Sequence, residues 1–206
     1  MSLAPIRALI LDLGNVLAFH DNAALFTRLG ERSGLSADEV ARRLGASAWE
    51  DANRGALDAE GIWRSTCAAI DTAIPLSEFT AIWSSHFTFN DSIFPVLEKL
   101  ADAMPLVLLS NTNWLHVAWL QPRLPVLRRF TERVYSCEVG MVKPEQAIYR
   151  EALRHTGMPA SDVAFFDDVP EYVDAARLAG LQGHVFTDTA AFVRTLSLRL
   201  PELKLT

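Results

Sequence analysis

The sequence contains few cysteines, and this scarcity limits the kinds of site it can build. Only two cysteines occur among the 206 residues, Cys67 and Cys137, and they lie far apart in the chain. They therefore do not form the closely spaced pair that a cysteine-based metal site requires. Two lone thiols are typical of a reducing compartment, although a single disulfide between them stays open as an alternative.

Long basic runs and long apolar runs are also missing. The chain has 19 Lys and Arg residues against 25 Asp and Glu residues, a formal net charge of −6. This balance argues against nucleic acids and anionic membranes as partners. No stretch is long enough to cross a bilayer, and residues 1–5 lack the basic and apolar segments of a signal peptide. We expect a cytoplasmic protein, monomer or homodimer, that acts on a small molecule.

Short apolar runs are present in number, and half of all residues are hydrophobic. The runs are residues 8–11, 106–109, 163–166 and 183–186, with a weaker one at 133–136. They are apolar throughout rather than alternating, as in strands that are buried on both faces of a parallel sheet. Helical spacing of apolar residues falls between them, at 92–101, 145–155 and 172–179. The order predicts an α/β fold, a Rossmann-like three-layer core with a parallel sheet.

The segment from Phe19 to Phe89 has a different pattern, without any strand-like apolar run. It contains amphipathic segments at residues 23–33, 36–44, 48–53, 58–70 and 76–87. We therefore expect an inserted α-helical cap domain of residues 18–89. It divides a discontinuous α/β core domain of residues 1–17 and 90–206. Such a cap is well placed to cover a site at the end of the first strand.

Polar side chains follow the predicted strands where each strand ends. These residues are Asp12, Ser110, Asn111, Lys143, Asp167 and Asp168. In an open α/β sheet, ligands bind outside the carboxyl ends of the strands. The six side chains are therefore expected to meet at one edge of the sheet. Pro144 suits the first turn of the following helix, where it would fix Lys143 just before that helix.

With these residues in this order, the sequence resembles the haloacid dehalogenase superfamily of phosphatases. Asp12 matches the first motif, Ser110 the second, Lys143 the third, and Asp167 with Asp168 the fourth. The resemblance covers essentially the whole chain, including the helical insertion, which corresponds to a cap of the C1 type. The phrases around these motifs are closest to a subgroup that includes bacterial glucose-1-phosphate phosphatases and the amino-terminal phosphatase domain of epoxide hydrolases.

The resemblance implies a Mg²⁺-dependent phosphatase of small phosphorylated metabolites, among which sugar phosphates are favoured. Asp12 would be the nucleophile and would form an aspartyl-phosphate. Ser110 and the backbone amide of Asn111 would hydrogen-bond the phosphoryl oxygens. Lys143 would neutralise charge on Asp12 and on the phosphoryl group.

The resemblance also implies the metal ligands. Asp12 and Asp168 would bind Mg²⁺, with Asp167 as a further ligand or as a supporting group, and the backbone carbonyl of Gly14 would be the third protein ligand. Independently of the family, two adjacent acids at the end of an apolar strand repel each other unless a cation or a lysine lies between them.

Three positions depart from the family pattern. Gly14 replaces the acid that protonates the leaving group, and losing a general acid commonly costs about 10²–10⁴-fold in rate. His20 or Asp21 could act in its place, or both could be ordinary loop residues. Val169 and Tyr172 stand where polar residues usually support the metal ligands, so we expect weaker metal binding.

Substrate recognition is expected from the cap. Trp49 suits stacking on a sugar ring, Arg54 suits binding of a hydroxyl or a second phosphate, and His20 lies where the cap begins. Each has an ordinary alternative, since Trp49 could pack in the core of the cap, Arg54 could be solvated and His20 could belong to a loop.

Two other functions fit parts of the pattern. A metal-free haloacid dehalogenase uses the same aspartate, Ser-Asn turn and lysine, but the acidic pair Asp167 and Asp168 favours the phosphatase. A catalytically weak regulatory or binding protein on the same fold is favoured by Gly14, Val169 and Tyr172. The intact Asp12 counts against this second alternative.

Overall fold

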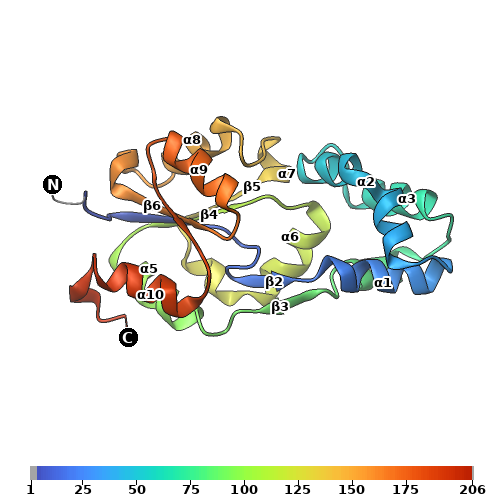
Figure 1. Ribbon diagram of the computed structural model, residues 1–206, viewed down its shortest axis with the longest axis horizontal. Helices are drawn as coiled ribbons and strands as arrows, with labels where there is room; N and C mark the ends of the chain where they lie inside the picture. The colour runs from blue at the N-terminus through green and yellow to red at the C-terminus, as the bar shows by residue number, and fades with distance from the viewer. Residues whose placement is uncertain (1–3, 206) are drawn as a thin grey trace.

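A five-stranded parallel sheet forms the centre of one end of the molecule, in the order β5-β4-β1-β6-β7 (Figure 1). The computed structural model describes residues 4–205, apart from the side chains of residues 46–48. The strands are β1 (Ala8–Leu11), β4 (Leu106–Ser110), β5 (Glu132–Tyr135), β6 (Val163–Asp167) and β7 (Gln182–Val185). All five runs predicted as strands are strands of this sheet, and the predicted α/β class is confirmed.

Helices cover both faces of the sheet, because its strands are apolar on both sides. The face that carries Leu9 and Leu11 packs on α5 (Phe94–Ala103), α6 (Trp114–Leu120) and α10 (Thr189–Ser197). The face that carries Ala8 and Ile10 packs on α8 (Gln146–Arg154) and α9 (Pro170–Leu178). Shorter helical turns are α7 (Ser136–Val139), η1 (Gln121–Arg123), η2 (Pro125–Arg129), η3 (Ala160–Asp162) and η4 (Pro201–Leu203). These are the three layers predicted from the sequence.

Four further helices form the opposite end of the molecule and have an apolar core of their own. They are α1 (Asn22–Ser33), α2 (Ala37–Asn53), α3 (Ala59–Ala69) and α4 (Leu76–Trp83). Phe79 and Trp83 are among the residues buried between them. In the described part of the chain, no helix combines the length and the apolarity that crossing a bilayer requires.

The sequence explains where these helices begin and where one of them breaks. The Ser36 hydroxyl accepts a hydrogen bond from the backbone N–H of Glu39 at 3.2 Å, and Asp58 accepts one from the N–H of Gly61 at 2.7 Å. Both side chains therefore act as N-caps. Helix α2 is interrupted at Gly45, which has a φ of 60°, a conformation that glycine adopts more readily than other residues. This break accounts for the two separate amphipathic segments in the sequence.

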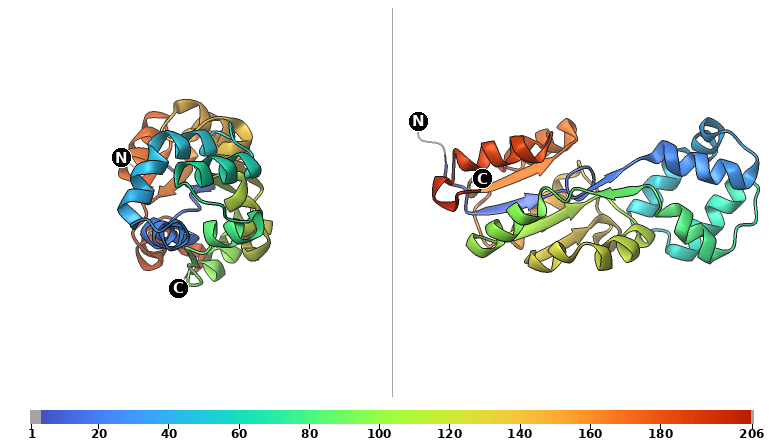
Figure 2. Two further views of the ribbon diagram at one scale, coloured as in Figure 1. Left: turned by 90° about the vertical axis from the view of Figure 1, so that its right-hand side faces the viewer. Right: turned by 90° about the horizontal axis from the view of Figure 1, so that it is seen from below.

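Two short strands join the two ends of the molecule, and they correct the expectation that residues 19–89 contain no strand (Figure 2). Strand β2 (Ala18–His20) pairs antiparallel with β3 (Phe87–Phe89), so that Ala18 lies opposite Phe89 and His20 opposite Phe87. Each strand has only three residues, too few to produce an apolar run, and Phe19 is 42% exposed. The pairing places the two chain segments that connect the ends of the molecule side by side. The division into domains at residues 18 and 89 stays a prediction.

Candidate active site

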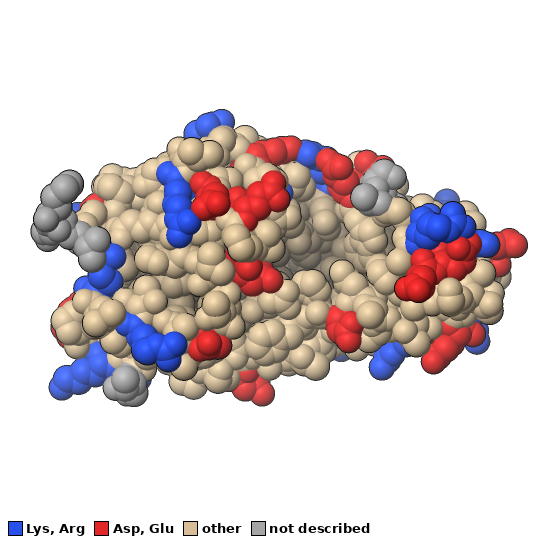
Figure 3. Space-filling view, in the orientation of Figure 1, with Lys and Arg blue, Asp and Glu red and all other residues tan. Residues whose placement is uncertain are grey.

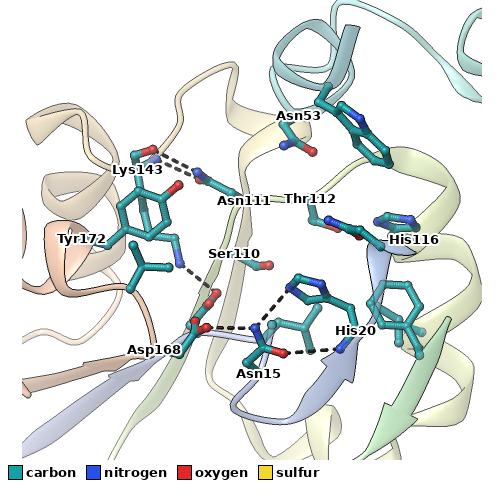
Figure 4. Close-up of a pocket in the computed structure, with 18 of the residues that line it drawn as sticks. Asn15, His20, Asn53, Ser110, Asn111, Thr112, His116, Lys143, Asp168 and Tyr172 are labelled. Atoms are coloured by element: carbon teal, nitrogen blue, oxygen red, sulfur yellow. Dashed lines mark hydrogen bonds and ion pairs between the residues drawn. The ribbon is translucent and has the colours of Figure 1, made fainter. Parts of the chain in front are cut away.

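A pocket of about 400 Å³ lies between the carboxyl edge of the sheet and the four helices at the other end. Figure 3 shows it as a hollow in the face of the molecule between these two parts. In Figure 4, Lys143 and Tyr172 lie on one side of the pocket, and Asn53 and His116 lie on the other, with Ser110 between them. The pocket therefore lies where the strand-end residues were expected to meet.

Asp12 is the first residue after β1 and lies on the wall of this pocket. Its backbone N–H donates to the Phe166 carbonyl at 3.0 Å, which holds it beside the end of β6. It is 6% exposed, and burial raises the pKa of its carboxyl to about 7, an effect that Lys143 opposes and Asp167 increases. One lysine is thus insufficient to keep this carboxyl strongly acidic, and further positive charge would favour its ionised form.

Lys143 lies between the buried acids. Its Nζ lies 2.8 Å from Asp12 Oδ1 and 2.6 Å from Asp167 Oδ2, and it donates to the Leu109 carbonyl at 3.2 Å. The ring of Tyr172 lies 5.1 Å from the same nitrogen. Burial alone would lower the pKa of Lys143, but the two carboxylates outweigh it and raise that pKa, so the ammonium stays charged. Lys143 therefore orients Asp12 and compensates its charge.

The loop that carries Lys143 is held by Asn111. The Asn111 amide donates to the Lys143 carbonyl at 2.9 Å and accepts from the Lys143 N–H at 2.8 Å. Pro144 follows in a turn that is closed by a 2.9 Å hydrogen bond from the Glu145 N–H to the Val142 carbonyl. Because this turn comes before α8 begins, the prediction that Pro144 lies in the first turn of that helix is wrong.

Three carboxylates form a cluster that suits a hard cation. Asp12, Asp167 and Asp168 each offer an oxygen within 4.8 Å of the others. Lys143 supplies one positive charge, so the cluster keeps an excess of negative charge that a divalent cation bound by oxygen atoms would balance. Asp167 uses one oxygen for Lys143 and the other to accept from the Val169 N–H at 2.9 Å. These contacts give Asp167 a supporting position. The Val169 backbone thus provides the polar contact that its side chain lacks.

Asn15 is a pocket residue that the sequence reasoning missed. Its amide nitrogen donates to Asp168 Oδ2 at 2.8 Å and lies 3.3 Å from His20 Nε2. Asn15 has a φ of 51°, a left-handed conformation that asparagine tolerates better than most residues. A polar residue directly after Gly14, at the end of a buried strand, was the available signal.

His20 reaches from β2 toward the place where residue 14 would carry a side chain. A Cβ built on Gly14 would lie 3.6 Å from His20 Nε2 and 3.7 Å from Asp12 Oδ2. These are ordinary van der Waals distances, so the backbone leaves room for a side chain there. The imidazole lies beside the space that an acidic side chain at position 14 would enter.

One wall of the pocket is largely aromatic. It contains Trp49 from α2, His86 just before β3, Phe87 at the start of β3, and His116 from α6. Trp49 stacks on Trp83 with 4.9 Å between the ring centroids, so it both lines the pocket and packs in the core of the four helices. His86 and Phe87 were not predicted as site residues because strand β3 was not predicted.

Arg54 does not line the pocket. Its guanidinium Nη2 lies 2.5 Å from Glu145 Oε1 and 3.0 Å from Glu50 Oε1. Both acids hold this charge at the junction between α2 and the Lys143 loop. The structure therefore does not bring Arg54 to the position expected of a substrate-binding residue, because an ion pair with the core occupies its side chain.

The family follows from comparison with known sequences. The model of the haloacid dehalogenase-like hydrolases matches residues 6–180. The chain belongs to the haloacid dehalogenase-like hydrolase family. Among curated relatives of this hydrolase, drimenol cyclase drtB of Aspergillus calidoustus is 26% identical over 186 residues, 88% of this chain. Bifunctional epoxide hydrolase 2 of Rattus norvegicus is 35% identical over 69 residues, 34% of this chain. The matched regions span 34% of the first relative and 12% of the second.

Solved structures share the fold of this hydrolase. A HAD family enzyme from Bacteroides thetaiotaomicron is 20% identical and superposes with a TM-score of 0.86, covering 93% of this chain and 98% of that one. The same protein has also been crystallised in complex with magnesium and inorganic phosphate. At this level of identity the likeness supports the fold alone.

Most of the predicted site residues of this hydrolase come together. Those that line the pocket are Asp12, Gly14, His20, Trp49, Ser110, Asn111, Lys143 and Asp168. Asp167 is fully buried behind them and contacts Lys143. The role of each stays a prediction, but the strand-end set is a geometric unit.

Proposed function

We propose that this haloacid dehalogenase-like hydrolase is a Mg²⁺-dependent phosphatase of small phosphorylated metabolites, with sugar phosphates as its main class of substrate. The observation that supports this proposal is the cluster of Asp12, Asp167 and Asp168 at the wall of a pocket, where Lys143 contacts Asp12 and Asp167 alone of the three. The magnesium and phosphate complex of the structural neighbour supports the same choice of metal and ligand.

Asp12 is the proposed nucleophile. Its Oδ1 is held by Lys143, which leaves Oδ2 to attack phosphorus. The new Oδ2–P bond replaces the bond between phosphorus and the leaving-group oxygen, and that oxygen takes up a proton as the alcohol departs. Water then attacks the aspartyl-phosphate, releasing inorganic phosphate and restoring the carboxylate. Ser110 and the backbone amide of Asn111 are the proposed donors to the phosphoryl oxygens.

The proposed metal ligands are Asp12, Asp168 and the backbone carbonyl of Gly14. When bound, Mg²⁺ supplies positive charge that stabilises the ionised carboxylates and the phosphoryl oxygens. Asn15 orients Asp168 through its 2.8 Å hydrogen bond, and Asp167 orients Lys143. These contacts hold the proposed ligands in place before a substrate arrives.

His20 and Trp49 are the proposed contacts to the leaving group. Both line the pocket, His20 from β2 and Trp49 from α2. His20 lies beside the empty place at Gly14, so it is the side chain best positioned to contact the ester oxygen that departs. Trp49 offers the flat surface on which a sugar ring can stack.

The test is hydrolysis of p-nitrophenyl phosphate and of a panel of sugar phosphates, each with Mg²⁺ and with EDTA. Asp12→Asn, which keeps the size of the side chain, is expected to lower kcat by at least about 10³-fold. Asp174→Asn removes an exposed acid on α9 and serves as the matched control. Turnover that persists in EDTA would contradict the metal. Turnover that persists in Asp12→Asn would contradict the nucleophile, and halide release from a 2-haloacid without metal would indicate a dehalogenase.

A further inference from the structure

In the described part of the chain, the half of the pocket that receives the leaving group contains no lysine or arginine. Among the pocket-lining residues of the described chain, Lys143 alone is a lysine or an arginine, and Asp12 and Asp167 already hold its ammonium. Arg54 is near in sequence to the pocket residue Asn53 but is paired elsewhere. The hollow in Figure 3 is correspondingly free of blue surface over most of its visible extent.

The histidines on this wall are uncharged at neutral pH. His86 and His116 are 6% and 8% exposed, and burial lowers the pKa of His86 to about 4 and that of His116 to about 3. His116 Nδ1 lies 3.1 Å from the Asn113 amide nitrogen. In the described chain, His116 Nε2 and His86 Nδ1 are buried without a hydrogen-bond partner. Both rings therefore present neutral aromatic surface rather than positive charge.

His20 lies at the boundary between the two halves of the pocket, and its ring contacts Asn15. Asn15 gives one amide hydrogen to Asp168 and directs its other toward His20 Nε2 at 3.3 Å.

The wall instead offers uncharged polar groups beside flat apolar surfaces. Asn22 and Asn53 bring two amides to the pocket, and Trp49 and Phe87 bring aromatic rings. Figure 4 shows Asn53 on the same side as His116, opposite Lys143 and Tyr172. Amides bind hydroxyl groups, and aromatic faces bind the C–H face of a ring, so this wall matches a compact, uncharged alcohol.

We propose that the site selects monophosphate esters of compact, uncharged alcohols and rejects esters whose leaving group carries a second phosphate or a carboxylate. This inference rests on the phosphatase function proposed above and specifies its substrate class. A second anion would lose its hydration on entering the pocket, and no lysine or arginine of the described wall would pair with it. It would also be repelled by the acidic pair Asp12 and Asp168. The expected discrimination in kcat/KM is at least about 100-fold.

Matched pairs of substrates test the inference directly. Glycerol 3-phosphate and 3-phosphoglycerate differ by one carboxylate, as do glucose 6-phosphate and 6-phosphogluconate. Phosphate release is measured for all four with Mg²⁺, and binding of the same compounds to Asp12→Asn is measured by calorimetry. The neutral member of each pair is expected to show the higher kcat/KM and the tighter binding.

A charge placed on the wall gives a second, independent test. Asn53→Arg is expected to reduce the discrimination within each pair at least about tenfold, because the new guanidinium can bind the second anion. Leu178→Arg adds the same charge at the far end of α9, where the side chain is 83% exposed, and is expected to leave the discrimination unchanged.

The outcomes separate this inference from the function on which it rests. If p-nitrophenyl phosphate is hydrolysed but both members of each pair react equally, the inference is wrong and the phosphatase function stands. If Asn53→Arg and Leu178→Arg change the discrimination equally, the proposed wall is wrong. If no ester is hydrolysed in Mg²⁺, the phosphatase function fails and this inference fails with it.

Discussion

Arg54 Nη2 lies 2.5 Å from Glu145 Oε1, and this ion pair joins the end of α2 to the loop that carries Lys143. The backbones approach closely at the neighbouring position, where a Cβ on Gly55 would collide with the Cys137 carbonyl. The helical end thus contacts the core through the β2–β3 pair, through this junction and through α6, whose Leu115 packs among the residues buried between the four helices. We expect closure of the pocket to depend on these contacts.

Removing the Arg54–Glu145 ion pair is expected to weaken closure of the pocket. Because both side chains are about one-third exposed, at 32% and 39%, the pair contributes at most about 1 kcal/mol. Arg54→Gln and Glu145→Gln should each raise KM up to about fivefold, and the double variant should raise it no further. Steady-state kinetics measure this cycle, with Glu60→Gln, which breaks only the exposed Glu60–Arg64 pair on α3, as the control. An additional rise in the double variant would mean that Arg54 contacts the substrate.

Lys143→Met is expected to destabilise the fold. It leaves Asp12 and Asp167 buried without their positive charge, which should lower the free energy of unfolding by about 3–5 kcal/mol at pH 8. Urea unfolding measures the loss, and Mg²⁺ should recover part of it by replacing the lost charge. Lys99→Met removes an exposed lysine and should change stability by less than about 0.5 kcal/mol. Equal effects of the two variants would show that the buried acids do not depend on Lys143.

Restoring an acid with Gly14→Asp should improve turnover of esters whose leaving group needs a proton. The Cβ is accommodated, since its nearest neighbours would lie 3.5–3.7 Å away. We expect a gain of up to about 100-fold on alkyl phosphates and little gain on p-nitrophenyl phosphate, whose leaving group departs without protonation. Gly14→Asn adds the same bulk without the acid. No difference between the two variants would mean that another group already transfers the proton.

Stability should depend on the buried histidines at mildly acidic pH. The pKa of His116 is lowered to about 3 and that of His86 to about 4, so the unfolded chain binds more protons than the folded one below pH 6.5. Their stabilising contribution is therefore full above pH 6.5 and is lost as pH falls, with a slope of up to about 1.4 kcal/mol per pH unit for each. The raised pKa of Asp12 acts in the opposite direction.

The histidine contribution is measured as a difference between proteins. Urea unfolding at pH 7, 6 and 5 is compared for the wild type and His116→Gln, and the variant should show the smaller loss of stability between pH 6.5 and pH 5. Parallel curves for the two proteins would show that His116 is accessible to protons in the folded state.

The sheet and the strand-end residues could be predicted because both depend on strong, local signals. Residues 8–11 and 163–166 are buried on both faces, so they are apolar throughout. Once these strands are parallel neighbours, Asp12 and Asp168 must meet at their common edge. The order of the motifs along the chain was sufficient for this part of the site.

Trp49 was predicted from the sequence, but the rest of the aromatic wall at β3 and the junction could not be, because they depend on distant contacts. His86 lies just before a strand of three residues that no apolar run marks. The Glu50 partner of Arg54 is four residues away on the same helix, whereas Glu145 is 91 residues away. A sequence pattern can indicate the first partner, but only the folded chain shows the second.

The pairing of Ala18 with Phe89 has a consequence for how such proteins change over evolution. Opposed residues of an antiparallel pair have Cα atoms about 4.5–5.5 Å apart. The segment between Ala18 and Phe89 therefore begins and ends at one place, which we call the seam. Recombination at this seam could replace helices α1–α4 of one relative by those of another while Asp12 and Lys143 keep their positions. The same seam is a suitable place to graft the helices of another protein onto this core, which could change the range of substrates.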